Sequence, residues 1–279
     1  MTQHFSNTDT ATIAAFGDEW ARHDQADLPD TERAQIFDDY FAIFPWESLP
    51  DDAEGFDMGC GSGRWAQVVA PHVAVLNCID PAQEALSVAR GNLAQQGNVR
   101  FHHAPSEAAP LAPASQDFGY SLGVLHHIPD TQSALRDCTA LLKPGAPFLL
   151  YLYYRFDNRP AWFRAIWKTS EVFRRLICAL PPKGRGLACE AIALTVYWPL
   201  SRLAGLLDRL GLPVDNLPLA YYRDKSLVTL RTDARDRFGT PLEQRFTKAE
   251  ITAMMERCGL CDIRFSDKAP YWVALGRKV

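Results

Sequence analysis

The stretch Phe56-Asp-Met-Gly-Cys-Gly-Ser-Gly-Arg64 decides the fold of this 279-residue chain. Its first three residues predict a short strand, and Gly59, Gly61 and Gly63 predict a loop in front of a helix. Glycines allow positive φ angles and a close approach of the backbone to a ligand, and a helix start offers free N–H groups. The stretch therefore predicts a nucleotide- or nucleoside-binding turn, without deciding between ligands.

An acidic residue stands at the expected distance from this turn. Asp80 lies at the end of the next predicted strand, 21 residues after Gly59, and Pro81 opens the following helix. A carboxylate in this position can accept hydrogen bonds from both hydroxyls of a ribose. The alternative is that Asp80 only caps the helix behind it.

The loop itself separates two cofactor classes. The dinucleotide pattern GxGxxG, started at Gly59, fails at Arg64, although the register that ends at Ala66 satisfies GxGxxA. However, Asp57 stands directly before the loop, where its carboxylate would repel a pyrophosphate and attract the ammonium group of a methionine moiety. This favours S-adenosylmethionine over a nicotinamide dinucleotide.

The chain around the loop alternates strands and helices. Apolar runs predict strands at 56–58, 73–79, 98–102, 117–122 and 147–153, and helices at 82–95 and 131–142. Such alternation is typical of βαβ units and a parallel sheet. The predicted organisation is an aromatic helical lid (1–50), a cofactor-binding α/β core (51–154), a helical cap inserted after the fifth strand (155–245), and a C-terminal helix with two strands, 262–265 and 271–275, that complete the core (246–279).

Composition narrows the classes of protein. With 47% hydrophobic and 22% charged residues the chain is globular, and its net charge of −4 argues against a surface built for nucleic acid. The seven cysteines are scattered, without ligand spacing for a metal, which fits reduced thiols. The N-terminus lacks the basic and apolar regions of a secretory signal, so a cytoplasmic location is expected.

These motifs together resemble the class I S-adenosylmethionine-dependent methyltransferases, in the broad group that includes the ubiquinone/menaquinone C-methyltransferases. The resemblance covers about 55–155. It is carried by the glycine stretch, by Ile79-Asp-Pro81, by Gln116-Asp-Phe-Gly-Tyr-Ser-Leu-Gly-Val-Leu-His-His-Ile-Pro-Asp130 and by Leu141-Leu-Lys-Pro-Gly145. It implies a Rossmann-like, mostly parallel sheet whose last strand is antiparallel.

The resemblance also implies roles for individual residues. The methionine end of the cofactor would lie at Asp57 and the three loop glycines, and its ribose at Asp80 and Pro81. The remaining cofactor contacts would be Ser106 and Glu107 beside the adenine, and Leu122 and Gly123 beside the sulfonium. The acidic residue usual before Ser106 is replaced by Pro105, so the adenine amine is expected to be bound differently.

Three side chains are candidates for catalysis. His126 and His127 follow the fourth predicted strand and titrate near neutrality, as a general base requires. The alternative is that one packs under the cofactor and the other caps the turn before Pro129. Tyr153 shares a strand face with Tyr151 by the period of two, where open α/β sheets place their ligands. Tyr154 is a candidate substrate contact.

The cap carries 16 basic and 9 acidic residues, a net +7 that leaves −11 on the rest of the chain. Tyr222, Arg223 and Lys225 are candidates for holding an anionic acceptor; a turn with internal Arg–Asp pairs is the alternative. Residues 187–212 are apolar with basic flanks, which suits peripheral membrane contact, although packing of helices on each other is the simpler interpretation.

The sequence therefore predicts an S-adenosylmethionine-dependent methyltransferase that acts on a small or lipid-like acceptor at oxygen, nitrogen or carbon. Two alternatives stay open: an NAD(P)-dependent oxidoreductase that uses the same loop, and a non-catalytic scaffold that retains a nucleoside pocket. A nucleic-acid substrate is not expected, because the core is acidic and no motif for flipped bases is present. The sequence does not predict the oligomeric state.

Overall fold

A computed structural model describes residues 7–22 and 28–279 of the chain. Seven strands form one sheet: β1 (Glu54–Met58), β2 (Val75–Asp80), β3 (Val99–His103), β4 (Phe118–Leu122), β5 (Pro147–Tyr151), β6 (Leu260–Phe265) and β7 (Val273–Lys278). The helices are α1 (Thr10–Arg22), α2 (Asp30–Phe41), α3 (Ala66–Val69), α4 (Gln83–Asn92), α5 (Thr131–Leu141), α6 (Ala161–Cys178), α7 (Pro182–Ile192), α8 (Trp198–Arg209), α9 (Leu227–Gly239) and α10 (Lys248–Arg257).

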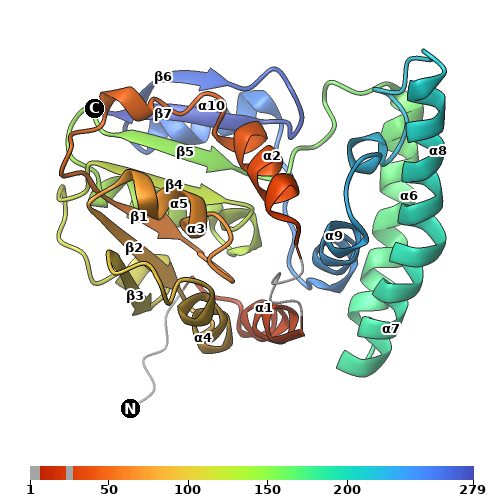
Figure 1. Cartoon of the computed structure of the whole chain (residues 1–279), viewed down its shortest axis with the longest axis horizontal. Coiled ribbons are helices and arrows are strands. Elements are labelled where there is room, and N and C mark those ends of the chain that lie inside the picture. Colours follow the sequence, from red (N-terminus) through yellow and green to blue (C-terminus); the bar gives the residue numbers. More distant parts are fainter. Residues whose placement is uncertain (1–6, 23–27) are drawn as a thin grey trace. The chain divides into compact units, whose positions relative to one another are not determined.

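The sheet has the order β3-β2-β1-β4-β5-β7-β6, and β7 runs antiparallel to its neighbours (Figure 1). The predicted mostly parallel α/β sheet with an antiparallel last strand is confirmed. Because β1 pairs with β2 on one side and β4 on the other, the strand order reverses between β1 and β4. Open α/β sheets bind their ligands at the carboxyl ends of strands beside such a reversal.

The end of the fifth strand differs from the prediction. β5 stops at Tyr151, so Tyr153 and Tyr154 lie beyond it instead of at its end. The physical reason is a change of pairing partner. The Tyr151 carbonyl accepts a bond from the Gly123 N–H, whereas the Tyr153 carbonyl accepts one from the N–H of Phe246, on a segment far along the chain.

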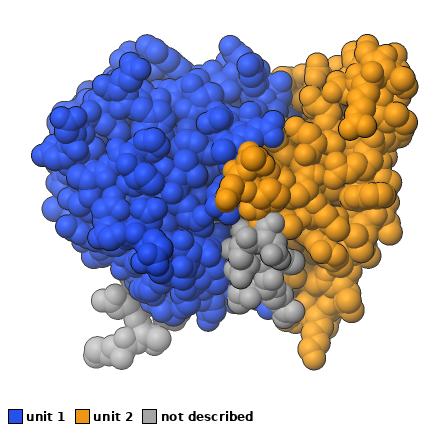
Figure 2. Space-filling model, in the orientation of Figure 1, with its two compact units in different colours: residues 1–24, 33–155, 242–279 blue, residues 25–32, 156–241 orange. Residues whose placement is uncertain are grey.

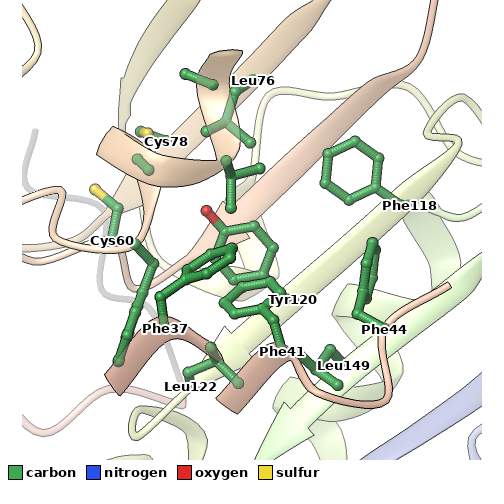
Figure 3. Close-up of a cluster of buried hydrophobic side chains, with 14 of the residues drawn as sticks. Phe37, Phe41, Phe44, Cys60, Leu76, Cys78, Phe118, Tyr120, Leu122 and Leu149 are labelled. Atoms are coloured by element: carbon green, nitrogen blue, oxygen red, sulfur yellow. The ribbon is translucent and has the colours of Figure 1, made fainter. Parts of the chain in front are cut away.

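One half of the core lies between the sheet and the aromatic side of α2 and its following loop (Figure 3). Phe41 lies edge-on to Tyr120 of β4 at 5.3 Å, and Phe44 lies edge-on to Phe118 at 5.9 Å. These aromatic side chains are buried, each with the large apolar area that such residues remove from water. The N-terminal aromatic residues therefore supply core packing.

The chain divides into two compact units, coloured separately in Figure 2. The first contains the sheet and consists of residues 1–24, 33–155 and 242–279. The second, residues 25–32 and 156–241, is helical and has its own buried cluster, in which α9 packs against both α6 and α7. No helix in the described residues is long and apolar enough to cross a membrane.

The second unit contains a π-helical turn, Ala193–Tyr197, that joins α7 to α8. Pro199 lies two residues after the end of this turn and has no N–H to donate, so an ordinary α-helical turn would leave a carbonyl unpaired and clash with the proline ring. A π-turn is one of the known ways to accommodate such an interruption. As a result, α7, the π-turn and α8 follow each other without a break. The number of residues per turn changes locally at the π-turn.

Candidate functional site

The glycine loop leaves β1 with a backbone that only glycine adopts easily. Gly59, Gly61 and Gly63 have φ angles of +80°, +55° and +78°. A Cβ on Gly59 would lie 2.3 Å from a methyl carbon of Val124, and one on Gly61 would lie 3.0 Å from the Trp20 ring. The loop therefore has no room for side chains, and α1 covers it through Trp20.

Asp57 is a buried carboxylate with an unused oxygen. Its exposed fraction is 1%, and its Oδ2 has no hydrogen-bond partner among the described residues. Burial raises its pKa from 3.8 to about 8, the neighbouring Tyr120 hydroxyl lowers it, and the charge of Asp80 raises it further. A cation that reaches Oδ2 would relieve this cost, so the site fits the ammonium group of a methionine moiety.

Asp80 connects the end of β2 to the glycine loop. Its Oδ2 accepts a bond from the Gly61 N–H at 2.9 Å, and its Oδ1 accepts one from the Ala82 N–H at 2.8 Å. Burial raises its pKa to about 6, against the effect of these two bonds. The local cap and the ligand role are compatible, because each carboxylate oxygen can accept a second bond from a ribose hydroxyl.

Two carboxylates thus stand together at the carboxyl ends of β1 and β2. The charge of Asp80 is close enough to raise the pKa of Asp57. Asp80, whose pKa is about 6, is ionised near neutral pH and would repel a pyrophosphate, whereas an ammonium group would be attracted to Asp80 and would allow Asp57 to ionise. The electrostatics of the site therefore suit S-adenosylmethionine better than a dinucleotide.

The pKa of Asp57 predicts how cofactor affinity depends on pH. Below about 8 the carboxyl group is mostly protonated in the unliganded protein, so binding of an ammonium group must release a proton. Affinity for S-adenosylhomocysteine should rise up to ~10-fold per pH unit between pH 6 and 8. Calorimetry in two buffers of different ionisation enthalpy measures the released proton. A pH-independent affinity with no proton release would contradict the assignment.

The same shift makes a prediction for stability. A carboxyl group whose pKa is raised on folding favours the folded state most below its unfolded pKa, and this contribution is lost as pH rises through the folded value. The unliganded protein should therefore lose stability between about pH 4 and pH 8 through Asp57. In Asp57→Asn this component of the pH dependence should disappear from thermal melts.

Replacement of Asp80 by alanine should weaken S-adenosylhomocysteine at least ~10-fold, the size of one or two lost bonds to a charged group. Because Asp80 also holds Gly61, affinity alone does not separate the two roles. The 2′-deoxyribose analogue does so: the wild type should discriminate against it, and Asp80→Ala should not. Equal discrimination by both proteins would remove Asp80 from the ribose site.

The other predicted cofactor contacts are on the neighbouring loops. Ser106 donates its hydroxyl to Asp137 at 3.1 Å, and the Glu107 carboxylate accepts a weak bond from the Asn7 N–H at 3.5 Å. Leu122 is buried at the end of β4, and a Cβ on Gly123 would meet no atom within 4 Å. The Pro81 carbonyl bonds a ring nitrogen of His103. Their roles toward a cofactor stay predictions.

His126 lies in the short helical turn that follows β4. It is fully buried, and neither ring nitrogen has a hydrogen-bond partner among the residues described. Its ring lies 4.0 Å from that of Tyr153 at an angle of 32°. Burial, together with His127 and Arg245, lowers its pKa well below 6.5, so the ring is neutral. A neutral ring with available nitrogens can accept a proton.

His127 has a different environment. Its Nδ1 lies 2.6 Å from the carbonyl oxygen of Leu242, and its ring meets Phe16 edge-on at 4.9 Å. His127 therefore contacts both Leu242, which follows the helical unit in the chain, and Phe16 of α1. These contacts fit a positioning role better than proton transfer.

The tyrosines that follow β5 separate into two environments. Tyr151 and Tyr153 lie with their ring centroids 5.9 Å apart, as expected for residues on one face. Tyr154 instead packs beside Tyr271 at 5.7 Å. The structure therefore brings Tyr153 to His126, whereas the ring of Tyr154 packs with a different set of aromatic side chains.

Sequence reasoning missed the segment 242–246, which forms a wall of this site. The Gln244 N–H donates to the His126 carbonyl at 3.0 Å, so the segment is tied to the histidine backbone. Arg245 lies 5.1 Å from the Tyr153 ring and pairs with the almost fully buried Glu243 at 2.7 Å. A capping box at Thr247 begins α10 directly after this segment, but nothing in the sequence indicated the segment's partners.

The three candidates in the second unit are engaged in contacts within that unit. Arg223 pairs with Asp208 at 3.1 Å, and Tyr222 packs near Tyr197 at 5.6 Å. Lys225 is 2% exposed, lies 3.7 Å from Asp224 and faces the Tyr221 ring. These contacts resemble the alternative, a turn with internal pairs. Their role toward an anionic acceptor stays a prediction.

Comparison with known proteins gives consistent matches. Residues 56–150 match the model of a methyltransferase domain. Among curated proteins, a ubiquinone biosynthesis O-methyltransferase of Xanthomonas campestris pv. campestris is 30% identical over 184 residues, which are 65% of this chain and 72% of that protein. One of Sodalis glossinidius is 32% identical over 120 residues, 42% of this chain and 47% of that protein. The chain thus spans about half the length of the Sodalis relative.

Among solved structures, the chain resembles one chain of the complex between the Haloferax volcanii Trm112 methyltransferase activator and a putative methyltransferase. The TM-score is 0.51 at 14% identity, with 95% of this chain and 96% of that chain covered. At this identity the likeness concerns the fold alone. It extends over nearly the whole chain, so the sheet and its connections follow a known arrangement.

Proposed function

Since the chain belongs to the class I S-adenosylmethionine-dependent methyltransferases, we propose that it transfers the methyl group of S-adenosylmethionine to an oxygen atom of a lipid-like, ring-bearing acceptor. The observation that carries the proposal is the buried Asp57, whose Oδ2 lacks a partner among the described residues at the end of β1. A buried carboxylate without a partner is costly unless a cation joins it. The family's cofactor carries such a cation.

The residues of this chain would divide the work as follows. Asp57, the glycine loop and Asp80 bind and orient the cofactor, which when bound supplies a methyl group on a positively charged sulfur. His126, neutral and with available ring nitrogens, accepts the proton of the acceptor hydroxyl. Trp20 lies over the glycine loop and limits the access of water.

Oxygen is favoured as the nucleophile by two observations. The relatives are named ubiquinone biosynthesis O-methyltransferases, whereas sequence motifs alone left oxygen, nitrogen and carbon open. A hydroxyl group must lose a proton on methylation, and His126 offers a base for it. The aromatic faces of Tyr151 and Tyr153 suit a ring-bearing acceptor.

Further parts of the proposal concern the acceptor's surroundings. An anionic group on the acceptor would be held by Arg223 and Lys225, and residues 187–212 would contact a membrane where a lipid-like acceptor resides. A cytoplasmic location stays a prediction. The comparisons support the methyltransferase hypothesis, and they support neither an NAD(P)-dependent oxidoreductase nor a scaffold without catalysis.

The test is a transfer assay with S-adenosylmethionine labelled in its methyl group. Three acceptors share one prenylated aromatic ring and differ in carrying a free hydroxyl, a methoxy or an amino group. Label should appear on the hydroxyl compound alone. Transfer to the methoxy compound would indicate a carbon nucleophile, and transfer to the amino compound alone would contradict the assignment of oxygen.

A further inference from the structure

Exposed hydrophobic side chains are concentrated in one part of the chain. Among the described residues, every exposed large hydrophobic side chain except Val279 lies between Trp162 and Leu212, on α6, α7, the π-turn and α8. Such a concentration of exposed apolar side chains is uncommon unless a partner covers them. The sheet-bearing unit has no comparable surface in its described residues.

On α6 these side chains form one stripe. Trp162, Ile166, Phe173 and Leu176 follow each other at intervals of four, seven and three residues, which places them on one side of α6, and Leu180 comes just after the end of the helix. They are 40–63% exposed. The packing side is a different one: Arg174 on that side is buried and bonds the Thr240 carbonyl. The side of α6 that packs within its unit is therefore different from the side that carries the exposed apolar stripe.

On α8 the same separation occurs. Leu203 and Leu206 lie three residues apart on α8 and are 49% and 55% exposed, Leu210 follows directly after the helix at 68%, and Val196 on the π-turn is 41% exposed. Small buried side chains, Ser201 and Ala204, face inward instead. Trp198 is 47% exposed and Trp162 is 48% exposed. Tryptophan is enriched where proteins meet the interface of a bilayer.

The charges on these helices have one predominant sign. The exposed charged residues of α6–α8 are Arg164, Lys168, Arg175, Lys183 and Arg209 on the basic side and Asp208 on the acidic side. Asp208 is paired with Arg223. Exposed basic residues on the same helices as large exposed apolar side chains attract anionic headgroups, and the apolar side chains can then be buried in the bilayer.

We propose that the exposed faces of α6 and α8 dock onto the surface of an anionic lipid bilayer. We call this surface the α6–α8 face. It adds α6, which lies outside 187–212, to the membrane contact expected for that range. A second copy of the chain is disfavoured as the partner, because it would bring the same basic residues against each other. Docking does not require methyl transfer, so either proposal can fail without the other.

The test uses the full chain and two kinds of vesicle. One consists of phosphatidylcholine alone, and the other also contains about 30% phosphatidylglycerol. Sedimentation should show binding to the anionic vesicles, weaker binding at high salt, and little binding to the neutral ones. Phe173→Glu with Leu206→Glu should lower the partition coefficient ~10-fold or more, since burial of each side chain contributes about that factor. Both side chains are more than half exposed, so the fold should tolerate the change.

The matched control, Ala94→Glu with Gln95→Glu, changes the net charge equally at exposed positions after α4. It should bind vesicles almost like the wild type, and all three proteins should keep the same affinity for S-adenosylhomocysteine. Equal loss in both double variants would attribute binding to net charge and overturn the docking face. A wild type that ignores anionic vesicles, or forms a dimer that only Phe173→Glu with Leu206→Glu dissolves, would also overturn it.

Discussion

Asp57→Asn should lower the affinity for S-adenosylhomocysteine ~100-fold, or about 2.7 kcal/mol. The amide has the shape of the carboxylate but carries no charge, so it cannot balance a buried ammonium group. Because the pKa of Asp57 is raised to about 8, its carboxyl group is mostly protonated at neutral pH. The stability of the unliganded protein therefore does not depend on a charge at this position. The melting temperature without ligand should therefore not fall. Calorimetric titration and thermal melts measure the two quantities.

Asp117→Asn is the matched control for this change. Asp117 lies just before β4, at the amino end of the strand, whereas Asp57 lies near the carboxyl end of β1. Asp117 pairs with Lys143 at 2.7 Å. The amide oxygen of asparagine can still accept the bond that Asp117 takes from the Glu54 N–H, and the change should leave cofactor affinity within ~2-fold. An unchanged affinity in folded Asp57→Asn would contradict the role assigned to the buried carboxylate.

His126→Phe should lower kcat ~100-fold or more at saturating cofactor, the usual contribution of a general base. Phenylalanine keeps an aromatic ring against Tyr153 but removes both ring nitrogens. The affinity for S-adenosylhomocysteine should stay within ~3-fold. Since the wild-type pKa lies well below 6.5, kcat at saturating cofactor should not decline through this group between pH 8 and pH 6.

His72→Phe makes the same chemical change at an exposed position and should leave kcat within ~2-fold. If His126→Phe retains full kcat, His126 only packs beside Tyr153, which is the structural alternative. A kcat that falls together with cofactor affinity would likewise assign the histidine to packing.

The cofactor half of the site could be predicted because its signals are local. The glycine loop needs positive φ angles within five residues, and Asp80 follows at a distance fixed by one helix and one strand. The alternation of strands and helices predicted the sheet for the same reason. Each of these features depends on short-range geometry that the sequence encodes directly.

The acceptor half could not be predicted to the same depth, because it depends on contacts between distant segments. The wall at 242–246 reaches His126 from more than a hundred residues away. The pairing of Phe246 with Tyr153 moves the end of β5 away from where its apolar run predicted it. Likewise, the burial of Lys225 depends on the packing of its own unit, although the sequence pattern alone suggests an exposed anion contact.

The most direct measurement is a calorimetric titration of the full chain with S-adenosylhomocysteine and, separately, with NADH. We expect micromolar binding of S-adenosylhomocysteine with release of a proton near pH 7, and no binding of NADH. Binding of NADH alone would contradict the electrostatic argument built on Asp57 and Asp80. Absence of binding by either ligand would contradict the proposal that the glycine loop holds a cofactor.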